Sequence, residues 1–458
     1  MYQLDFNNPC HVYFCGIGGI SMSGLAEILL SRGFRVSGSD MKESELTRIL
    51  ENKGAKVFIG QRSENITDDI DLFVYTAAIS SDNPEWIAMK ELKIEELSRA
   101  QLLGQIMKNF ELPIAISGTH GKTTTTSMIT EILMKADTDP TVSVGGMLKS
   151  IEGNLRIGHS KYFVTEACEY TNSFLNFFPK ISLILNIEED HMDFFKDIDD
   201  IRASFSKFAS LLPGDGTLII NGEIDNVDAI ANCAKCGFVT YGMSDSFDYY
   251  ATDINYDELA HPSYILHSKK GESKISLSVP GIHNVYNSMA AVAFADTVGI
   301  DRQVSVDALK CFTGTDRRFE KKGEIGGVTI IDDYAHHPTE IKATLKAALN
   351  YPHKTLWCVF QPHTYTRTKA FLHDFAQSLI LADKVVLADI YAAREKNTIG
   401  IYSTDLQKEI QDLGRECYYF PTFDEIENFL LENCSQGDLL ITMGAGDIVK
   451  VGESLLGK

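Results

Sequence analysis

Short apolar strands that lead directly into glycine turns and helices set the strongest limit on how this chain can fold. One such unit runs from His11 to Gly33, and a second runs from Leu112 to Ala136. Beyond Asp316–Glu320, further apolar strands alternate with helical segments. Alternation of this kind is typical of parallel sheets covered by helices. We therefore predict an α/β protein whose sheets are mostly parallel.

The length and the breaks in this pattern indicate three domains. A chain of 458 residues is long enough for about three domains of ordinary size. A helical segment ends near Lys108, and the segment from Asp316 to Lys322 separates the second set of strands from the third. We place the domains at residues 1–108, 109–318 and 319–458, with an antiparallel insert from Asp245 to Pro280. The segment Asp316–Lys322 is the expected hinge.

The charge of the chain limits its partners. The formal net charge is -21, which argues against non-specific binding of nucleic acids or anionic membranes. The chain begins without the basic stretch and apolar core of a signal peptide, and no apolar run approaches about 18 residues. We therefore expect a cytoplasmic protein, monomeric or weakly dimeric, that acts on small molecules.

The sequence GTHGKT, Gly118–Thr123, is the sharpest local signal. It lies between an apolar strand and an apolar-periodic helix, where backbone amides and the helix N-terminus can wrap a polyphosphate. Lys122 would contact the β- and γ-phosphates, and the Thr123 hydroxyl would bind Mg²⁺. Ile116 occupies the position of the first glycine in the general phosphate-loop pattern. The alternative is a glycine-rich turn capped by threonines, without a nucleotide.

A second candidate phosphate-binding turn contains Gly16, Gly18 and Gly19. These glycines follow a strand and precede a helix, and Asp40 ends the next strand, where a ribose hydroxyl is often bound. Ser21 replaces the third glycine of the dinucleotide-binding pattern. The turn fits a UDP-sugar as well as it fits NAD, so an NAD-dependent nucleotide-sugar oxidoreductase remains an alternative.

Acidic and imidazole side chains follow two strands of the predicted central sheet. Glu166 and Glu169 come after one apolar strand, and His191 comes after another. The carboxyl ends of parallel strands gather at the sheet edge that also carries the phosphate loop. Glu166, His191 and Thr123 are therefore predicted to bind one Mg²⁺ together with ATP. In isolation, each of these residues is more often solvated or structural.

Seven sequence blocks occur in the order that is seen in Mur ligases. They are GTHGKTTTT, EACEYTNSF, NIEEDHMD, PGIHNVYN, DRRFE, DDYAHHPTE and QPHTYTRT, and GIGGISMSG precedes them. The chain resembles the Mur ligase family, and its last two blocks resemble the alanine-adding member more than its siblings. The resemblance implies a Rossmann-like N-terminal domain for the UDP-sugar, a central P-loop-type ATPase domain, and a Rossmann-like C-terminal domain for the amino acid.

The resemblance also implies a reaction. A Mur ligase of this type uses ATP and Mg²⁺ to join L-alanine to the lactyl carboxylate of UDP-N-acetylmuramate, a step in the synthesis of peptidoglycan precursors. The carboxylate is activated as an acyl phosphate, and the products include ADP and phosphate. A sibling that recycles muropeptides attaches a tripeptide to the same sugar nucleotide and remains an alternative. A regulatory module that binds ATP without catalysis is another.

The matching blocks carry the family's site residues onto this sequence. The expected catalytic residues are Lys122, Glu166 and His191, and the expected Mg²⁺ ligands are Thr123, Glu166 and His191. ATP is expected to contact Gly118, Thr119, His120, Gly121, Lys122, Thr123, Thr124, His283, Asn287, Arg318 and Asp333. The UDP-sugar is expected to contact Gly16, Gly18, Gly19, Ser39 and Asp40, and the alanine is expected to contact Tyr334, His336, His363 and Arg367.

The chain departs from the family pattern at several positions. Cys168 and Tyr170 lie in a block where EADESDxSF is frequent, and Thr364 stands where many members have arginine. Arg367 is therefore the main expected partner of the alanine carboxylate. Some siblings use a carbamylated lysine after the metal-binding histidine, and Lys207 is the nearest candidate here.

Overall fold

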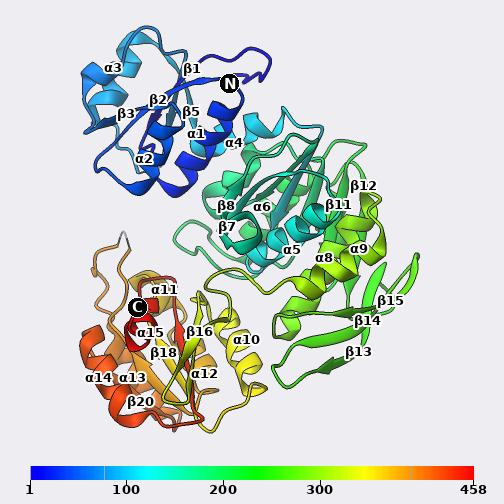
Figure 1. Ribbon diagram of the computed structural model, residues 1–458, viewed down its shortest axis with the longest axis vertical. Helices are drawn as coiled ribbons and strands as arrows, with labels where there is room; N and C mark the ends of the chain where they lie inside the picture. The colour runs from blue at the N-terminus through cyan, green and yellow to red at the C-terminus, as the bar shows by residue number, and fades with distance from the viewer. Residues whose placement is uncertain (1, 77, 394) are drawn as a thin grey trace.

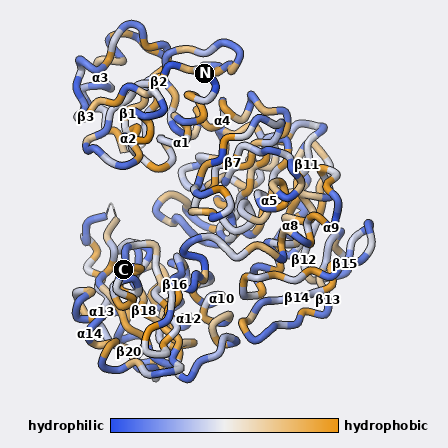
Figure 2. The backbone as a smooth tube through the Cα atoms, in the orientation of Figure 1, coloured by the Kyte–Doolittle hydropathy of each residue, from blue (hydrophilic) through white to orange (hydrophobic). Residues whose placement is uncertain are grey.

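The computed structural model describes residues 2–76, 78–393 and 395–458. Within these residues, three β-sheets of five, ten and six strands follow one another along the chain. Figure 1 shows them as three units, with the blue N-terminal unit at the top, the central unit at the right and the orange C-terminal unit at the lower left. In Figure 2, hydrophobic segments gather inside each unit. The predicted α/β class is confirmed.

All strands of the N-terminal sheet are parallel, in the order β3-β2-β1-β4-β5. The central strand β1 is buried along its whole length, as expected for a parallel sheet that is covered on both faces. The elements are β1 (His11–Cys15), α1 (Ile20–Ser31), β2 (Arg35–Asp40), α2 (Glu45–Asn52), β3 (Lys56–Ile59), β4 (Leu72–Tyr75), α3 (Pro84–Leu92), β5 (Glu95–Ser98) and α4 (Arg99–Met107).

The central sheet has the strand order β15-β14-β13-β12-β11-β10-β6-β9-β7-β8. It is parallel from β13 to β7 and antiparallel at both edges. The expected antiparallel insert is present as β13, β14 and β15. The strands are β6 (Leu112–Ser117), β7 (Thr141–Leu148), β8 (Gly153–Arg156), β9 (Tyr162–Glu166), β10 (Ile181–Ile184), β11 (Thr217–Asn221), β12 (Gly237–Gly242), β13 (Tyr249–Tyr256), β14 (Pro262–Ser268) and β15 (Gly271–Ser276).

Helices cover both faces of the central sheet. Neighbouring residues of β6 belong to different cores: Ala115 belongs to the core that includes α6, whereas Ile116 belongs to the core that includes α5 and α8. Because β6 is buried on both faces, its C-terminal end, which leads into the glycine loop, is held in place. The helices are α5 (Lys122–Lys135), α6 (Ile198–Ala209), α7 (Val227–Ala231), α8 (Ile282–Thr297) and α9 (Arg302–Cys311).

The C-terminal sheet has the order β16-β17-β21-β18-β19-β20, and only the edge strand β16 is antiparallel to its neighbour. The strands are β16 (Glu320–Ile325), β17 (Val328–Asp333), β18 (Leu356–Phe360), β19 (Lys384–Leu387), β20 (Glu416–Tyr419) and β21 (Leu439–Met443). The helices are α10 (Pro338–Leu349), α11 (Tyr365–Ala370), α12 (Leu372–Leu379), α13 (Ser403–Asp412), α14 (Phe423–Asn433) and α15 (Val449–Leu455).

Helix α4 joins the N-terminal unit tightly to the central one. A Cβ atom on Gly104 would lie 1.9 Å from the carbonyl oxygen of Asn176, so only glycine permits this approach. Arg32 adds a 2.9 Å hydrogen bond to the carbonyl of Gly158, and one hydrophobic core runs from Leu4 to Ala231. The boundaries placed at 108 and 318 lie outside all three sheets, and the division into three domains at these residues stays a prediction.

Each helix in the described part of the chain is too short or too polar to serve as a membrane span.

Candidate active site between the central and C-terminal units

The glycine loop between β6 and α5 has the backbone geometry of a phosphate-binding loop. Gly118 and Gly121 have φ angles of 144° and 82°, which favour glycine. A Cβ atom on Gly121 would also lie 2.6 Å from Oδ1 of Asn287 on α8. The loop therefore packs against α8, and the amides of the first turn of α5 have no carbonyl partners within the helix. Such amides and the helix dipole favour an anion.

The Lys122 amine lies inside this loop. It donates hydrogen bonds to the carbonyl oxygens of Gly118 and Thr119, and its Nζ lies 3.1 Å from Oε2 of Glu169. Burial alone would lower the pKa of Lys122, but the carboxylate of Glu169 raises it well above its usual value. Lys122 is therefore a fixed cation beside the anion-binding turn. Glu169 follows a strand in the sequence, but its pairing with Lys122 was not predicted.

Thr123 and Glu166 both face the glycine pair of β7. Oε1 of Glu166 accepts a 2.6 Å hydrogen bond from the amide of Gly145, and a Cβ atom on Gly146 would lie 3.2 Å from Cγ2 of Thr123. A hydroxyl and a carboxylate are oxygen ligands of the kind that Mg²⁺ prefers. Thr123 and Glu166 therefore have the chemistry of Mg²⁺ ligands, and both lie beside the same pair of glycines.

His191 packs against Tyr170, the residue that follows Glu169. Its backbone has a φ angle of 54°, and its ring stacks on Tyr170 with 4.5 Å between the ring centroids. Among the described residues, no hydrogen bond or ion pair joins His191 to Thr123 or Glu166. Its role as a third Mg²⁺ ligand stays a prediction. Lys207 is exposed in the last turn of α6.

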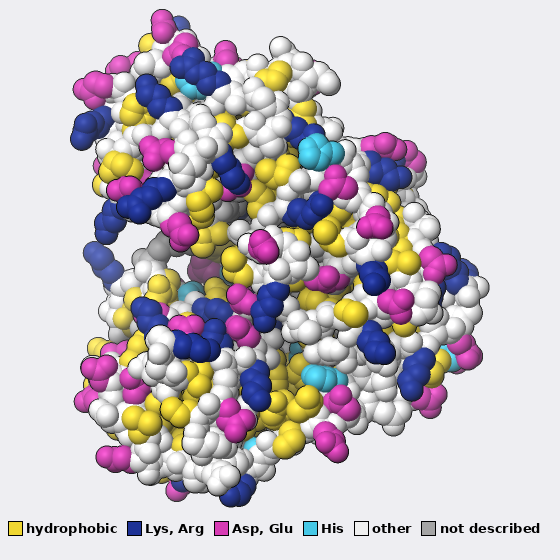
Figure 3. All heavy atoms as spheres, viewed as in Figure 1, with side chains coloured by type: hydrophobic (Ala, Val, Ile, Leu, Met, Phe, Trp, Pro, Cys, Tyr) yellow, Lys and Arg dark blue, Asp and Glu magenta, His cyan; other side chains and the backbone are white. Residues whose placement is uncertain are grey.

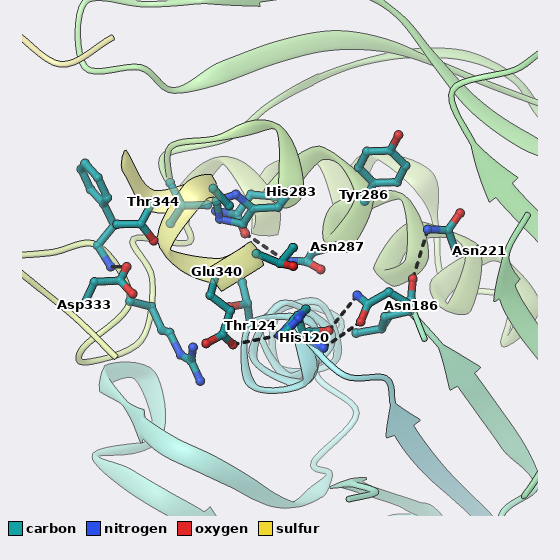
Figure 4. A pocket seen from close by; sticks show the side chains of 18 of the residues that line it. His120, Thr124, Asn186, Asn221, His283, Tyr286, Asn287, Asp333, Glu340 and Thr344 are labelled. Atoms are coloured by element: carbon teal, nitrogen blue, oxygen red, sulfur yellow. Dashed lines mark hydrogen bonds and ion pairs between the residues drawn. The ribbon is translucent and has the colours of Figure 1, made fainter. Parts of the chain in front are cut away.

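A pocket opens between the glycine loop, α8 and α10, and most of the predicted ATP-binding residues line it (Figure 4). The lining includes His120, Gly121, Thr124, Asn186, Tyr241, His283, Tyr286, Asn287, Arg318 and Asp333. Burial, together with the charge of Arg318, lowers the pKa of His283 to about 4. Its imidazole is therefore neutral at pH 7. Aromatic rings and amide side chains in this pocket suit a flat heterocycle.

Arg317 and Arg318 have different roles. Arg317 bonds to Asp332 at 2.9 Å and to two carbonyl oxygens of the loop after β21, so it anchors the predicted hinge segment to the C-terminal unit. Arg318 lines the pocket. Asp333 also lines the pocket, and both of its carboxylate oxygens accept backbone hydrogen bonds of 2.8 Å. Burial outweighs the charge of Arg318 and raises the pKa of Asp333 to about 6.

The residues predicted to bind the amino acid come together. The ring centroid of His336 lies 5.5 Å from that of Tyr334 and 5.7 Å from that of His363, and Arg367 approaches Nδ1 of His363 at 3.3 Å. Burial lowers the pKa of both histidines to about 4. His363 and Arg367 also line a second pocket with His191, which places the predicted metal ligand beside the predicted amino-acid site.

Three consecutive acidic residues of the central unit, Glu188, Glu189 and Asp190, contact the C-terminal unit. Their partners are Thr339 (2.6 Å to Glu188), His337 (3.0 Å to the carbonyl oxygen of Glu189) and Arg367 (2.8 Å to Asp190). His120 of the glycine loop approaches Oε1 of Glu340 at 3.1 Å in the same region. These contacts close the central unit onto the C-terminal unit, and none of them was predicted.

The first glycine turn has the expected shape. Gly16 has a φ angle of 88°, Gly19 is the N-cap of α1, and the amide of Gly18 donates a 2.9 Å hydrogen bond to Asp40. Ser39 supports the turn only through its carbonyl oxygen, because its buried hydroxyl donates to Glu85 at 2.7 Å. The side chain of Ser39 is therefore held by Glu85, and its contact with the UDP-sugar stays a prediction. In Figure 3, the surface is hollowed where the N-terminal and C-terminal units face each other.

Three family models match the chain in succession. "Mur ligase family, catalytic domain" matches residues 11–111, "Mur ligase middle domain" matches residues 116–295, and "Mur ligase, glutamate ligase domain" matches residues 317–446. Together these matches span nearly the whole chain, in the order of the three sheets.

Curated relatives and solved structures agree with these matches. Proteins named UDP-N-acetylmuramate–L-alanine ligase from Agathobacter rectalis and Lachnospira eligens are each 58% identical to this chain, and each pair is covered over its full length. A solved UDP-N-acetylmuramate-alanine ligase from Thermotoga maritima has a TM-score of 0.80 at 28% identity, over 98% of each chain. A solved murein peptide ligase from Psychrobacter arcticus has a TM-score of 0.70 at 25% identity, also over 98% of each chain.

Proposed function

The chain belongs to the Mur ligase family, and we propose that it joins L-alanine to the lactyl carboxylate of UDP-N-acetylmuramate with the conversion of ATP to ADP and phosphate. The observation that carries this proposal is the 58% identity, over the full length, to relatives that bear the name of this activity. The tripeptide-attaching ligase and the NAD-dependent oxidoreductase are not favoured, because the relatives at this identity carry neither name.

The glycine loop supports the ATP-dependent half of the reaction. A carboxylate is a poor electrophile, so it must first attack the γ-phosphorus to form an acyl phosphate, with ADP as the leaving group. Lys122 is a cation held at the start of α5, where it can offset the charge that gathers on the transferred phosphoryl group. Thr123 and Glu166 supply oxygen ligands for Mg²⁺, and a bound ion would reduce the repulsion among the phosphates.

The pocket between the central and C-terminal units supports nucleotide binding. The neutral His283 and the amide of Asn287 can meet the adenine, and the Asp333 carboxylate can accept from a ribose hydroxyl. UDP-N-acetylmuramate would reach the loop from the turn that contains Gly16 and Gly18. Each substrate is therefore held by a different unit, and closure of the units brings the reacting groups together and excludes water from the acyl phosphate.

The cluster around Arg367 supports the second half of the reaction. Its guanidinium can bind the alanine carboxylate, and the neutral His336, whose Nδ1 donates to the carbonyl oxygen of Tyr334, can accept a hydrogen bond from the amine at Nε2. The amine, once deprotonated, attacks the acyl carbon and forms a tetrahedral oxyanion. Collapse of that oxyanion expels phosphate and leaves the amide bond.

Phosphate release tests the proposal directly. The protein is incubated with ATP, Mg²⁺ and UDP-N-acetylmuramate, and single amino acids or the tripeptide are added in turn. We expect release to require every component and to be fastest with L-alanine. Glycine and L-serine should be slower than L-alanine but still active, because a difference of one small group changes the free energy of the transition state by only about 1–3 kcal/mol. Release driven only by the tripeptide, or reduction of a nicotinamide cofactor without ATP, would contradict the proposal.

A further inference from the structure

His120, Glu188 and His337 form a cluster at the boundary of the central and C-terminal units. One ligand atom from each of these side chains lies within 4.8 Å of the other two. His120 belongs to the glycine loop, Glu188 to the acidic segment after β10, and His337 is the residue before the first turn of α10. Two neighbouring units thus contribute to one cluster of two imidazoles and a carboxylate.

One ring nitrogen of His120 has no well-formed hydrogen bond. Burial alone would lower the pKa of this histidine, but Glu188 and Glu340 outweigh burial and raise the pKa to about 9, so a metal ion would displace the proton from that nitrogen. Nδ1 lies 3.1 Å from Oε1 of Glu340, so Nδ1 donates to that carboxylate. Nε2 is buried without a hydrogen-bond partner, although it lies 3.4 Å from Oε2 of Glu188. In Figure 4, His120 and Glu340 point toward each other across the pocket wall. The unpartnered nitrogen therefore faces the rest of the cluster.

His337 is arranged in the same way. Its Nε2 lies 3.0 Å from the carbonyl oxygen of Glu189, which can only accept, so Nε2 carries the proton. The lone pair then lies on Nδ1, which accepts a long hydrogen bond of 3.4 Å from the amide of Thr339. Each histidine has one nitrogen held by an outer acceptor, and a metal ion at Nδ1 of His337 would replace the long hydrogen bond from Thr339. Metal-binding histidines are oriented by such outer partners.

We propose that His120, Glu188 and His337 form a binding site for Zn²⁺ or a similar first-row divalent ion, separate from the Mg²⁺ that accompanies ATP. Two imidazoles and a carboxylate suit such ions, whereas Mg²⁺ prefers oxygen ligands alone. Ligand atoms around a tetrahedral Zn²⁺ lie about 3.4 Å apart. The side chains therefore need to approach one another by at most about 1.4 Å from the spacing in this structure.

A bound ion would fix the closed arrangement of the two units. His120 and Glu188 line the nucleotide pocket, and His337 caps α10 of the facing unit. An ion that bridges them would hold the pocket shut between catalytic cycles. The ion is therefore expected to inhibit turnover. This second expectation rests on the proposed ligase function, whereas the binding of the ion does not.

Co²⁺ absorption spectroscopy tests the binding, because a site of low coordination number gives visible bands that Zn²⁺ abolishes when it replaces Co²⁺. Cys233, Cys236 and Cys311 are free thiols that would compete for the metal, so the background is the full chain with these residues replaced by serine. The test variants are H337N, whose amide can still cap α10, and E188Q, which can still accept from Thr339. The matched control is H373Q, because His373 is an exposed histidine paired with Glu409.

We expect one Co²⁺ per chain in the background protein and in H373Q, and at least about tenfold weaker binding in H337N and in E188Q. Thermal unfolding of each variant verifies that it is folded. Equal binding in all four proteins, or no visible band in any of them, would overturn the site. If the site is real, Zn²⁺ slows phosphate release in the background protein more than in H337N. If no protein releases phosphate although Co²⁺ binds as expected, the proposed function fails and the metal site stands.

Discussion

Arg367 of α11 donates a 2.8 Å hydrogen bond to Asp190, so a cation of the C-terminal unit is neutralised by a carboxylate of the central unit. The two side chains are only 11% and 9% exposed. Burial alone would raise the pKa of Asp190, but Arg367 holds it well below its usual value. Arg367 is also the residue predicted to bind the alanine carboxylate. The incoming carboxylate must therefore compete with Asp190 for the guanidinium or share it.

Substitutions of these two residues should change alanine binding in opposite directions. Arg367→Ala removes the cation and is expected to raise KM for L-alanine by about 10-fold or more, which corresponds to about 1.4 kcal/mol or more. Asp190→Asn removes the competing anion and is expected to lower that KM, while the unpaired buried guanidinium costs about 3 kcal/mol of folding free energy. Steady-state kinetics and urea unfolding measure both effects. A KM that moves the same way in both variants contradicts this competition.

Lys122→Ala should abolish turnover, with a loss of about 100-fold or more in kcat, because a cation beside the transferred phosphoryl group is removed. The variant should also be less stable, because Glu169 is left buried without its partner. The matched double variant K122A/E169Q should regain thermal stability but not phosphate release. Recovery of activity in the double variant would show that Lys122 has only a structural role.

Gly145→Ala should weaken Mg²⁺ binding without breaking the fold. The new Cβ atom would lie 2.7 Å from Oε2 of Glu166, so the carboxylate must move away from its place beside Thr123. We expect about a 10-fold increase in the Mg²⁺ concentration that gives half-maximal phosphate release. Gly237→Ala is the control, because nothing lies within 4 Å of its added Cβ atom. An unchanged Mg²⁺ requirement in G145A would remove Glu166 from the metal site.

The affinity for ATP should fall in mild acid. Burial raises the pKa of Asp333 to about 6, so the carboxylate that would accept from the ribose is present above that pH and is lost as the pH falls through it. KM for ATP is therefore expected to rise several-fold between pH 7 and pH 5. Asp333→Asn should have a high KM that depends little on pH over this range. The two pH profiles, measured at saturating alanine, decide between this role and a purely structural one.

The order of the elements could be predicted from local patterns because each parallel strand is a short apolar run that ends in polar or glycine residues. The glycine loop at Gly118–Thr123 was predicted in the same way and has the expected backbone. The strand β7 was missed, because Gly145 and Gly146 interrupt its apolar alternation. The hydrogen bond from Ser39 to Glu85 could not be predicted either, since β2 is buried on both faces and its pattern does not distinguish them.

The contacts across the pocket could not be predicted from the sequence. Glu340 lies 220 residues from His120, and Arg367 lies 177 residues from Asp190. Each pair depends on how two different sheets are oriented relative to each other. Local patterns in the sequence do not predict that orientation. The sequence identified His336 and His363 through the family blocks alone, because each is an ordinary polar residue in its own segment.

The close packing of α4 against the carbonyl oxygen of Asn176 determines which unit of the molecule can rotate relative to the others. Because no side chain separates Gly104 from that carbonyl, we expect the first unit and the middle of the chain to move together. We therefore expect the nucleotide pocket to open by rotation of the last 140 or so residues about the predicted hinge near Arg317. In a fragment that ends at residue 108, the apolar face of α4 would be exposed to solvent. We expect that fragment to aggregate rather than to remain a soluble monomer.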